Sequence, residues 1–315
     1  MGIRGLNALI KRYAPDAIQV CDISKYKNSK VAIDCSILLY KFKYASRAEN
    51  SHLIGIANRI KFYLMNGILP IFVFDGAPPD AKKITLLKRQ SAKEKMYTRL
   101  EELRAKTPET DEENNNIKDE IKKLMSQLIV IKKSHVDESK ELLKKAGIPY
   151  CTAPEDAEKY CAFLQKNGIV DYTITDDTDA STFGCDTILK TSIHKNITEI
   201  NTKLILERFE MTHDSFVDFC ILSGCDYTES IPHIGPVTSY NLIKKHGNIE
   251  NILSTMQKDR PNFDYIICRK IFKEFSYEIP DIFEKKIVNK EELLEFLTKH
   301  NFKENVISKF IKILF

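Results

Sequence analysis

The segment from Ala153 to Gly184 reads APEDAEKYCAFLQKNGIVDYTITDDTDASTFG and carries acidic residues beside the ends of predicted helices and strands. This acidic series consists of Asp156, Glu158, Asp176, Asp177 and Asp179. Clustered carboxylates repel one another and are costly to bury, so a fold that gathers them favours cations between them. Mg²⁺ and Mn²⁺ prefer such oxygen ligands and leave positions open for a phosphate. A solvated acidic surface is the alternative, and an isolated DDTD sequence does not decide between the two.

The local geometry of this segment restricts how the carboxylates can meet. Pro154 opens a predicted helix, in which Asp156 and Glu158 are two residues, or about 200°, apart. Both can reach one site only if Asp156 lies at the start of the helix with non-helical backbone. The sequence DYTIT predicts a buried strand, and in an extended segment after it Asp177 and Asp179 point the same way.

Two further apolar stretches predict buried strands that end in an aspartate. KVAIDCS (residues 30–36) contains Asp34, and LPIFVFDG (residues 69–76) contains Asp75. Continuous apolar runs are typical of parallel strands, and ligands bind at the carboxyl edge of open α/β sheets. The sequence therefore predicts an α/β fold with a mostly parallel twisted sheet, flanked by helices, and acidic side chains along one edge.

Composition restricts the class of protein. The 315 residues are 43% hydrophobic, which is normal for a folded chain with a large core. Eight cysteines without a CxxC pair argue against zinc and predict a reduced compartment. No apolar run approaches the ~18 residues of a membrane span, and the first residues lack the layout of a signal peptide. A soluble intracellular protein without a membrane partner is expected.

Residues 81–133 are highly charged and differ from the segments on either side. Apolar residues recur there at helical spacing around the polar sequence TPETDEENNN, so we expect two helices joined by a loop, forming a mobile cap. Lys82, Arg89 and Lys93 are spaced by seven and four residues and share one face of the first helix. Such a face is commonly only solvated, but this one begins seven residues after Asp75 and would overhang the acidic edge.

The sequence after residue 213 predicts a pair of helices. Phe216–Ser223 is an apolar helix ended by Gly224, and a second helix runs to His246 before Gly247. A helix, two turns and a helix present backbone N–H groups to a phosphate; an ordinary helical hairpin is the alternative. From Ser254 on, one or two amphipathic helices are expected.

Six motifs occur in the order and spacing of one known family. They are MGIRGL (1–6), VAIDCS (31–36), FVFDGAPP (72–79), APEDAE (153–158), TDDTDASTFG (175–184) and SGCDYTESIPHIGP (223–236). In these motifs the chain resembles the flap endonucleases, the structure-specific 5′ nucleases of replication and repair, from Met1 to about Ile252. Agreement of separate signals is far more specific than any one motif. The resemblance implies a PIN-like nuclease core with a helical cap and a DNA-binding helix–two-turn–helix element, in a viral or otherwise tail-less member.

The resemblance also implies a division of the chain. An N-terminal nuclease region would span residues 1–106 and would include the first cap helix, at about 82–106. The rest of the cap would span residues 107–133. An internal nuclease region with the helix–two-turn–helix element, at about 214–247, would span residues 134–253, and a C-terminal helical segment would span residues 254–315.

For the metal site, the resemblance implies two Mg²⁺ ions, with Mn²⁺ as an alternative, and it allows K⁺ at the helix–two-turn–helix element. One divalent ion would be served by Asp34, Asp75, Asp156 and Glu158, and the other by Asp177, Asp179 and Asp226. Asp176 precedes the matching pair and is not expected to be a ligand. Lys82 and Arg89 would be the catalytic basic residues of the cap.

For DNA, the resemblance implies that Tyr40 stacks on a base and that Gly2 lies beside the site. Further DNA contacts are expected from Arg47, Arg59, Lys93, Ile231, Ile234 and Gly235. The net charge of the whole chain is only +4. If the seven ligand carboxylates are set aside, 37 of the 44 acidic residues remain against 48 basic ones, which leaves a charge of +11. The remaining surface is therefore basic and suits nucleic acid.

Several positions depart from the family pattern. Asp156 stands where the family usually has Glu, so it is expected to reach a metal ion through water. Val237 and Thr238 replace Lys and Arg after the IGP turn, which weakens the grip on phosphate. The loop before Ser51 is short, which puts a pocket for a one-nucleotide 3′ flap in doubt. A sliding-clamp motif and a basic tail are not found, so a clamp partner and a nuclear signal are not supported. A monomer is expected, located in the nucleus or at a viral replication site without a recognisable targeting signal.

The leading functional hypothesis is a Mg²⁺-dependent 5′ flap endonuclease with 5′–3′ exonuclease activity on branched DNA. A repair nuclease of the same superfamily that prefers 5′ ends, gaps or bubbles is the alternative. A catalytically silent DNA-structure-binding protein is disfavoured, because retaining all seven carboxylates has a cost in stability.

Overall fold

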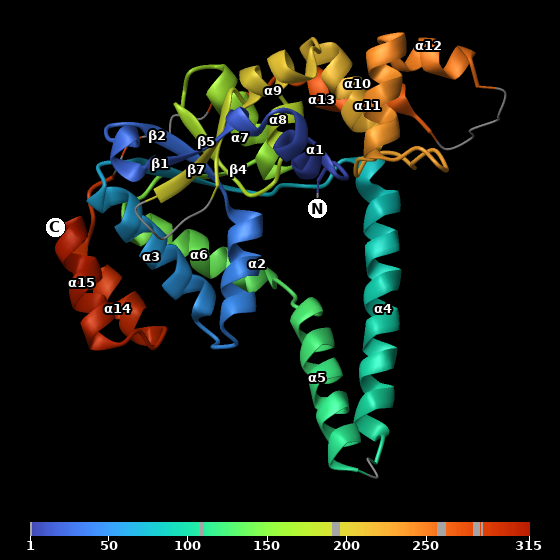
Figure 1. The fold of residues 1–315 in the computed structure, drawn as a ribbon. Helices are drawn as coiled ribbons and strands as arrows, with labels where there is room; N and C mark the ends of the chain where they lie inside the picture. The colour runs from blue at the N-terminus through green and yellow to red at the C-terminus, as the bar shows by residue number, and fades with distance from the viewer. Residues whose placement is uncertain (1, 108–109, 191–195, 257–262, 280–283, 285) are drawn as a thin grey trace.

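The computed structural model describes residues 2–107, 110–190, 196–256, 263–279, 284 and 286–315 (Figure 1). Its strands form one seven-stranded sheet in the order β1-β7-β6-β5-β2-β3-β4. Their bounds are β1 Ile18–Asp22, β2 Lys30–Asp34, β3 Leu69–Phe74, β4 Tyr150–Thr152, β5 Tyr172–Ile174, β6 Thr187–Leu189 and β7 Asn196–Asn201. Neighbours are parallel from β6 to β4, whereas β7 runs antiparallel to β6 and β1. The prediction of a mostly parallel sheet flanked by helices is confirmed.

The helices lie on both sides of this sheet and at its ends (Figure 1). Those before the cap are α1 Leu6–Tyr13, α2 Cys35–Ala45 and α3 Ser51–Met65, and the cap itself contains α4 Lys83–Ala105 and α5 Asp111–Gln127. Next come α6 Lys133–Lys145, α7 Ala157–Lys166, α8 Asp179–Thr182, α9 Thr202–Phe209, α10 His213–Ser223 and α11 Pro236–His246. The last four are α12 Ile249–Ser254, α13 Tyr265–Lys273, α14 Lys290–Lys299 and α15 Glu304–Leu314. Short 3₁₀ segments cover Pro15–Ala17, Ile23–Tyr26 and Asp80–Lys82.

The central strands divide their side chains between two apolar cores. Ile33 of β2 and its neighbour Phe72 of β3 pack with α2, α3 and α6, together with α14 and α15. Ala32 and its neighbour Ile71 point to the opposite face and pack with α7. Because successive side chains of a strand alternate between faces, a continuous apolar run serves both cores. This double burial fixes the carboxyl ends of β2 and β3 side by side.

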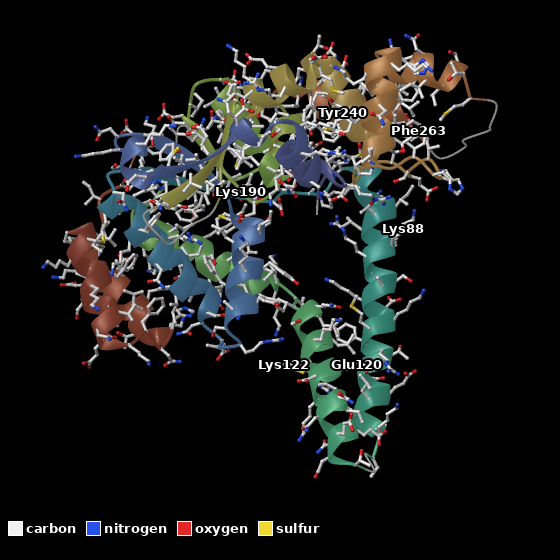
Figure 2. The ribbon with its side chains drawn as sticks, in the orientation of Figure 1. Lys88, Glu120, Lys122, Lys190, Tyr240 and Phe263 are labelled. Atoms are coloured by element: carbon white, nitrogen blue, oxygen red, sulfur yellow. The ribbon has the colours of Figure 1, made fainter. Side chains whose placement is uncertain are left out.

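The cap consists of two long helices that stand away from the sheet (Figure 1). Leu100 and Leu103 are the buried side chains of α4, and they lie in its last two turns. Arg99 donates to Glu120 over 2.9 Å, and Glu120 lies about midway along α5 (Figure 2). The prediction of two helices joined by a loop is therefore confirmed, whereas the mobility of the cap stays a prediction.

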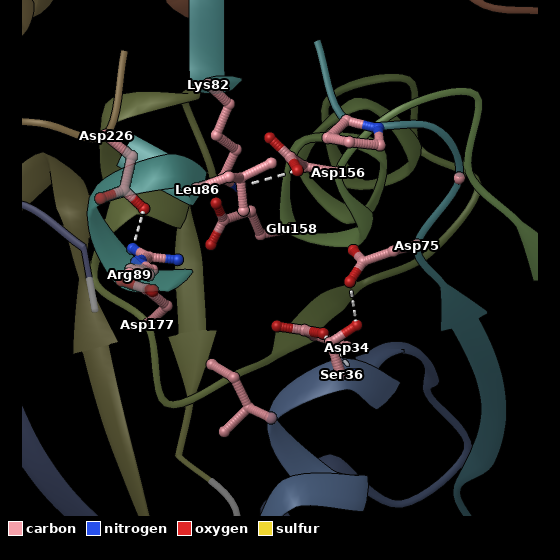
Figure 3. Close-up of a pocket in the computed structure, with 13 residues that line it drawn as sticks. Asp34, Ser36, Asp75, Lys82, Leu86, Arg89, Asp156, Glu158, Asp177 and Asp226 are labelled. Carbon is pink, nitrogen blue, oxygen red and sulfur yellow. Dashed lines mark hydrogen bonds and ion pairs between the residues drawn. The ribbon is translucent and has the colours of Figure 1, made fainter. Parts of the chain in front are cut away.

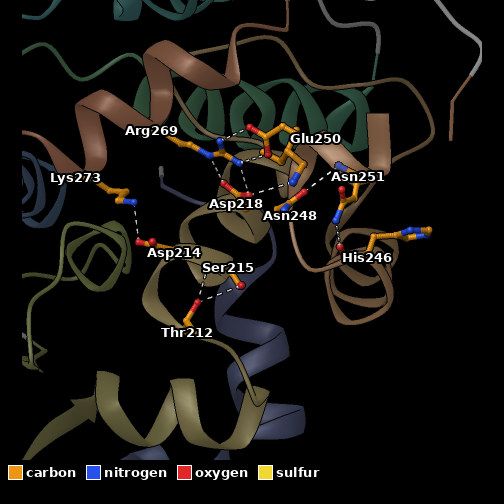
Figure 4. Close-up of polar contacts among 11 residues, drawn as sticks. Thr212, Asp214, Ser215, Asp218, His246, Asn248, Glu250, Asn251, Arg269 and Lys273 are labelled. Carbon is orange, nitrogen blue, oxygen red and sulfur yellow. Dashed lines mark hydrogen bonds and ion pairs between the residues drawn. The ribbon is translucent and has the colours of Figure 1, made fainter. Parts of the chain in front are cut away.

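An ionic network ties the helix–two-turn–helix element to the helices after it (Figure 4). Arg269 of α13 donates to Asp218 of α10 over 2.5 Å and to Glu250 of α12 over 2.7 Å. Asp218 is buried and also accepts a hydrogen bond from the backbone N–H of Ile249 at 3.1 Å. A buried carboxylate needs such partners. The network therefore holds α10 in one position relative to α12 and α13, and so also orients α11, which packs on α10.

The C-terminal part differs from expectation in the number of helices. After Ser254 the described residues contain α13, α14 and α15, where one or two helices were expected. Leu293, Phe296 and Phe310 from α14 and α15 belong to the same core as α3 and α6. Nowhere in the described chain is a helix both long and apolar enough to cross a membrane.

Candidate active site

Three neighbouring parallel strands bring their carboxylates to one edge of the sheet. Asp34 ends β2, Asp75 follows β3 and Asp177 follows β5, and all three line one cavity of about 280 Å³ (Figure 3). Asp34 caps α2 by accepting the Ser36 N–H at 3.0 Å, and it also accepts from the Thr175 hydroxyl at 3.1 Å. The predicted meeting of Asp34 and Asp75 at the carboxyl edge is confirmed.

The start of α7 brings the next two carboxylates to this cavity. Asp156 is the N-cap of α7 with extended backbone, φ −71° and ψ 136°, and Glu158 lies in the first turn. Both line the cavity, so the requirement for a non-helical Asp156 is met. Asp75 fixes this arrangement, because its Oδ1 accepts the Ala157 N–H at 2.8 Å.

Gly76 joins the end of β3 to the same helix start. Its N–H donates to the Glu155 carbonyl at 2.7 Å. A Cβ at position 76 would lie 2.0 Å from the Ala153 carbonyl oxygen, so only glycine allows this approach. The strand that presents Asp75 and the turn that presents Asp156 are therefore in direct backbone contact.

Asp177 and Asp179 meet through a turn and not through an extended segment. Thr178 has αR geometry and α8 begins at Asp179, so the expectation of extended backbone is wrong. The Asp179 N–H donates to Asp177 Oδ1 at 3.2 Å, which closes the turn. Oxygen atoms of Glu158, Asp177 and Asp179 nevertheless lie within 4.8 Å of one another. The two aspartates are therefore brought together by a tight turn, and not by the alternation of side chains along a strand.

The electrostatics of this cluster fit a bound cation. Burial, with a contribution from Asp75, raises the pKa of Asp34 to about 7. Burial and the charge of Asp177 likewise raise the pKa of both Glu158 and Asp179 well above their usual values. A divalent ion bound among these three carboxyl groups would stabilise their ionised forms, because it offsets their mutual repulsion and takes oxygen ligands. The donor set therefore suits Mg²⁺ or Mn²⁺.

Basic side chains of the cap close the cavity from the other side. Lys82 donates to Asp156 at 2.8 Å, and Arg89 donates to Asp226 at 2.6 Å (Figure 3). Burial opposes the charge of Lys82, but the nearby Glu158 and Asp156 outweigh it, so the pKa of Lys82 is raised. Lys93 does not line the cavity. Of the three residues on the predicted basic face, Lys82 and Arg89 reach the carboxylates.

Gly2 lies against the cluster, as the resemblance implied. It has a φ of 98°, and a Cβ there would lie 2.1 Å from Asp177 Oδ1 and 2.6 Å from Asp179 Oδ1. The next residue, Ile3, donates its backbone N–H to Asp179. Gly2 and Ile3 thus lie in direct contact with the carboxylate cluster.

Asp176 is turned to different partners. Its carboxylate pairs with Lys41 at 2.5 Å, and its carbonyl accepts from Lys190 at 2.7 Å. Asp176 does not line the cavity, which agrees with its exclusion from the predicted ligands.

The expected DNA contacts fall into two groups. Tyr40 is partly exposed on α2, and Gly235 has open space where a Cβ would be. Ile231 and Ile234, by contrast, are buried, so only their backbone can face a phosphate. Arg47 donates to the Met125 carbonyl in the last turn of α5 at 2.7 Å, and so ties the cap to the end of α2.

Arg59 corrects one expectation. It is only 7% exposed on α3. Burial raises the pKa of the neighbouring Tyr63, and the charge of Arg59 only partly offsets this rise. A guanidinium in this position packs inside the protein and offers little to DNA. The signal was present in the sequence, because Ile56, Arg59 and Tyr63 share the buried stripe of α3.

Sequence reasoning missed the side chains that hold the carboxylates in place. Ser36 donates to Asp75, Thr175 donates to Asp34, and the Tyr227 hydroxyl donates to Asp156 at 2.9 Å. Each lies one or two residues from an acidic motif position, a spacing that could have identified them.

Comparisons with known proteins agree with this geometry. Residues 1–96 match the XPG N-terminal domain and residues 147–226 match the XPG I-region. Flap endonuclease 1 of Aedes aegypti is 39% identical over 91% of this chain and 78% of its own length. Flap endonuclease 1-A of Oryza sativa subsp. japonica is 35% identical over 99% of this chain and 86% of its own.

Solved structures show the same fold. The flap endonuclease-1 from Methanococcus jannaschii has a TM-score of 0.69 and 25% identity, covering 94% of this chain and 95% of its own. The catalytic core of Rad2 in complex with DNA substrate has a TM-score of 0.76 and 22% identity, covering 100% of both chains. The sequence relatives extend over nearly the whole chain, and this chain therefore belongs to the flap endonuclease family.

Proposed function

We propose that this protein is a divalent-metal-dependent nuclease that cuts DNA phosphodiesters at the base of a 5′ single-stranded flap and also removes nucleotides from 5′ ends. The observation that carries the proposal is the single cavity in which buried carboxylates face the cap residues Lys82 and Arg89. Family membership supports the same conclusion.

The carboxylates would hold two ions in two groups. Asp177, Asp179 and Asp226 would serve one ion, and Asp34 and Asp75, which lie together in the cavity, would serve the other. Glu158, expected in the group of Asp34 and Asp75, also lies close enough to Asp177 and Asp179 to share an ion with them, so in this proposal it bridges the two groups. When bound, divalent ions activate a water molecule and stabilise the leaving oxygen of a phosphodiester. We propose Mg²⁺ as the resident ion, Mn²⁺ as a substitute and K⁺ at the helix–two-turn–helix element.

Asp156 has a different role from Glu158 in this proposal. One of its oxygens accepts from Lys82 and the other from Tyr227, so both are already used by the protein. Asp156 therefore orients Lys82 and contacts an ion only through water, whereas Glu158 is a direct ligand.

Lys82 and Arg89 act on the substrate in this proposal. Charge builds on the phosphate oxygens during cleavage, and fixed cations stabilise that charge most where water is excluded. Lys82 is largely buried beneath the cap and meets this condition. The backbone at Gly235 and the side chain of Tyr40 would position the duplex and a base, which selects DNA structure and not sequence.

The test is a cleavage assay with end-labelled flap, nicked, gapped and bubble duplexes, with Mg²⁺, with Mn²⁺ and with EDTA. Asp179→Asn keeps an acceptor for the Ile3 N–H but loses the charge, so cleavage should fall by ~10³-fold or more while DNA binding persists. Asp176→Asn is the matched control, because Asp176 is adjacent but paired with Lys41. Cleavage by Asp179→Asn within tenfold of wild type would contradict the metal assignment.

Substrate preference is decided by the same panel. If the flap duplex is cleaved fastest, the result supports a flap endonuclease. If gapped or bubble duplexes are cleaved faster, the result favours a repair nuclease of the same superfamily. We further propose that the protein acts as a monomer without a sliding-clamp partner and in the nucleus or at a viral replication site; sedimentation, clamp-addition and localisation measurements test these points.

A further inference from the structure

We propose that Tyr97 of α4 is a stacking platform for a base of the single strand that leaves the active-site cavity along the cap. This proposal rests on the proposed function and adds a positioning residue that binds the flap outside the metal site.

The first observation is the continuity of one face of α4. Lys82, Leu86 and Arg89 line the cavity, and an α-helix advances 100° per residue, so Lys93 and Tyr97 lie within about 60° of Lys82 around the axis. The face that closes the cavity therefore continues along the cap as far as Tyr97.

The second observation is the charge of this face. Glu102 lies on the opposite side of the helix from Lys82, whereas Glu101 and Glu94 lie about 100° and 120° from Lys82 and are the helical neighbours of Tyr97 at i+4 and i−3. From Lys82 to Lys93 the face is basic and apolar, and Tyr97 ends it as an exposed ring between this basic stretch and the two glutamates. A basic track interleaved with an aromatic ring is the surface that binds single-stranded nucleic acid without reading its sequence.

The third observation is the surroundings of the Tyr97 ring. It is 44% exposed, and the buried side chains of α4, Leu100 and Leu103, lie farther along the helix. Within the described part of the chain, no hydrogen bond is made by the Tyr97 hydroxyl and no other aromatic ring contacts it. The ring is thus available on one side, whereas Tyr13 and Tyr240, for comparison, stack on each other at 4.7 Å.

The position of Tyr97 predicts which nucleotide it meets. Eight residues separate it from Arg89, or ~12 Å along the axis. At a stacked spacing of ~3.4 Å per nucleotide, the platform lies roughly three to four nucleotides beyond the phosphate held at Arg89. A flap shorter than this does not reach the ring.

The experiment compares three substrates: a long flap, the same flap made of abasic nucleotides, and a nicked duplex without a flap. Tyr97→Ala should bind the long flap about tenfold more weakly, the value of one base on an aromatic ring. It should bind the other two like wild type, and cleave all three at the wild-type rate when saturated. Tyr97→Phe should restore flap affinity, because the ring remains.

A positional readout separates stacking from a general loss of affinity. A 2-aminopurine at the third or fourth flap nucleotide should be quenched by wild type and Tyr97→Phe but not by Tyr97→Ala. Ile84→Ala is the matched control, since Ile84 is 50% exposed on the opposite side of α4, and it should change nothing.

The outcomes distinguish this inference from the proposed function. If wild type fails to cleave the long flap, the proposed function fails first. If wild type cleaves it and Tyr97→Ala weakens all three substrates equally, Tyr97 serves only the packing of the cap and the platform is refuted. Unchanged flap affinity in Tyr97→Ala refutes it as well.

Discussion

Replacing Asp34 with Asn should make the protein more stable when divalent ions are removed. Burial, with a contribution from Asp75, raises the pKa of Asp34 from 3.8 to about 7. Each tenfold change in proton affinity is worth ~1.4 kcal/mol, so the ionised carboxylate opposes folding by on the order of 4 kcal/mol at pH 8. Because the pKa is higher in the folded protein, this penalty is absent below pH 3.8, grows as the pH rises, and is complete above about pH 7.

Asn can keep the contacts that Asp34 makes. Its carbonyl oxygen can accept the Ser36 N–H, and its amide can donate to the Thr175 hydroxyl, which now donates to Asp34. The expected gain in the free energy of unfolding is therefore about 2–4 kcal/mol at pH 8 and about 1–2 kcal/mol at pH 5. For a chain of this size the gain at pH 8 raises Tm by roughly 3–6 °C.

Thermal unfolding in EDTA at pH 8 and pH 5, followed by calorimetry, measures this gain. Asp264→Asn is the matched control, because Asp264 is an exposed N-cap that accepts the Ile267 N–H at 3.0 Å. Its Tm should hardly change. Adding Mg²⁺ should raise the Tm of wild type more than that of Asp34→Asn. If Asp34→Asn is no more stable than wild type at pH 8, or gains equally at both pH values, the electrostatic reasoning is refuted.

Arg89→Ala should lower the single-turnover cleavage rate by ~10²-fold or more with little change in duplex affinity, whereas Lys93→Ala should have a smaller effect; equal losses of binding and rate in both variants would show only a general electrostatic contribution. Asp156→Glu should retain activity because a water-mediated contact tolerates a longer side chain, and Glu158→Asp should be severely impaired; a metal-soaked crystal with a direct Asp156–metal bond of ~2.1 Å would contradict this. Burial lowers the pKa of His52, so stability should fall as pH drops below ~6.5, and His52→Gln should flatten the Tm profile between pH 7.5 and 5; an unchanged profile would contradict this assignment.

Local physics made the carboxylates at the strand ends predictable. The apolar runs before Asp34 and Asp75 are long enough to be buried on both faces, and such strands end at one edge of a parallel sheet. Asp156 was predictable as a helix N-cap, because two carboxylates on one regular helix turn could not both face the cavity.

Other features depend on contacts between distant segments. β6 has only three residues, and the side chains of β1 show no clear alternation of burial. These strands are therefore defined by pairing with their neighbours, β7 for β1 and β5 and β7 for β6, more than by their own sequences. The turn at Thr178 escaped prediction for a similar reason, because the same residues can be extended or helical until their neighbours are known. Arg59 shows the opposite failure, since its burial followed from a periodicity already visible in the sequence.

The contact at Gly76 has a consequence for the ions that the site accepts. Asp75 and Gly76 both bond to the start of α7, so the end of β3 and the turn at Asp156 move as one rigid unit. Ca²⁺ needs oxygens at ~2.3–2.6 Å and Mg²⁺ at ~2.0–2.1 Å. In the proposed site, the extra radius would have to be accommodated by the turn of Asp177 and Asp179, which follows the end of β5 and lies outside this unit. We therefore expect discrimination between small and large ions to depend on the stiffness of that turn and on Gly2, which lies against it.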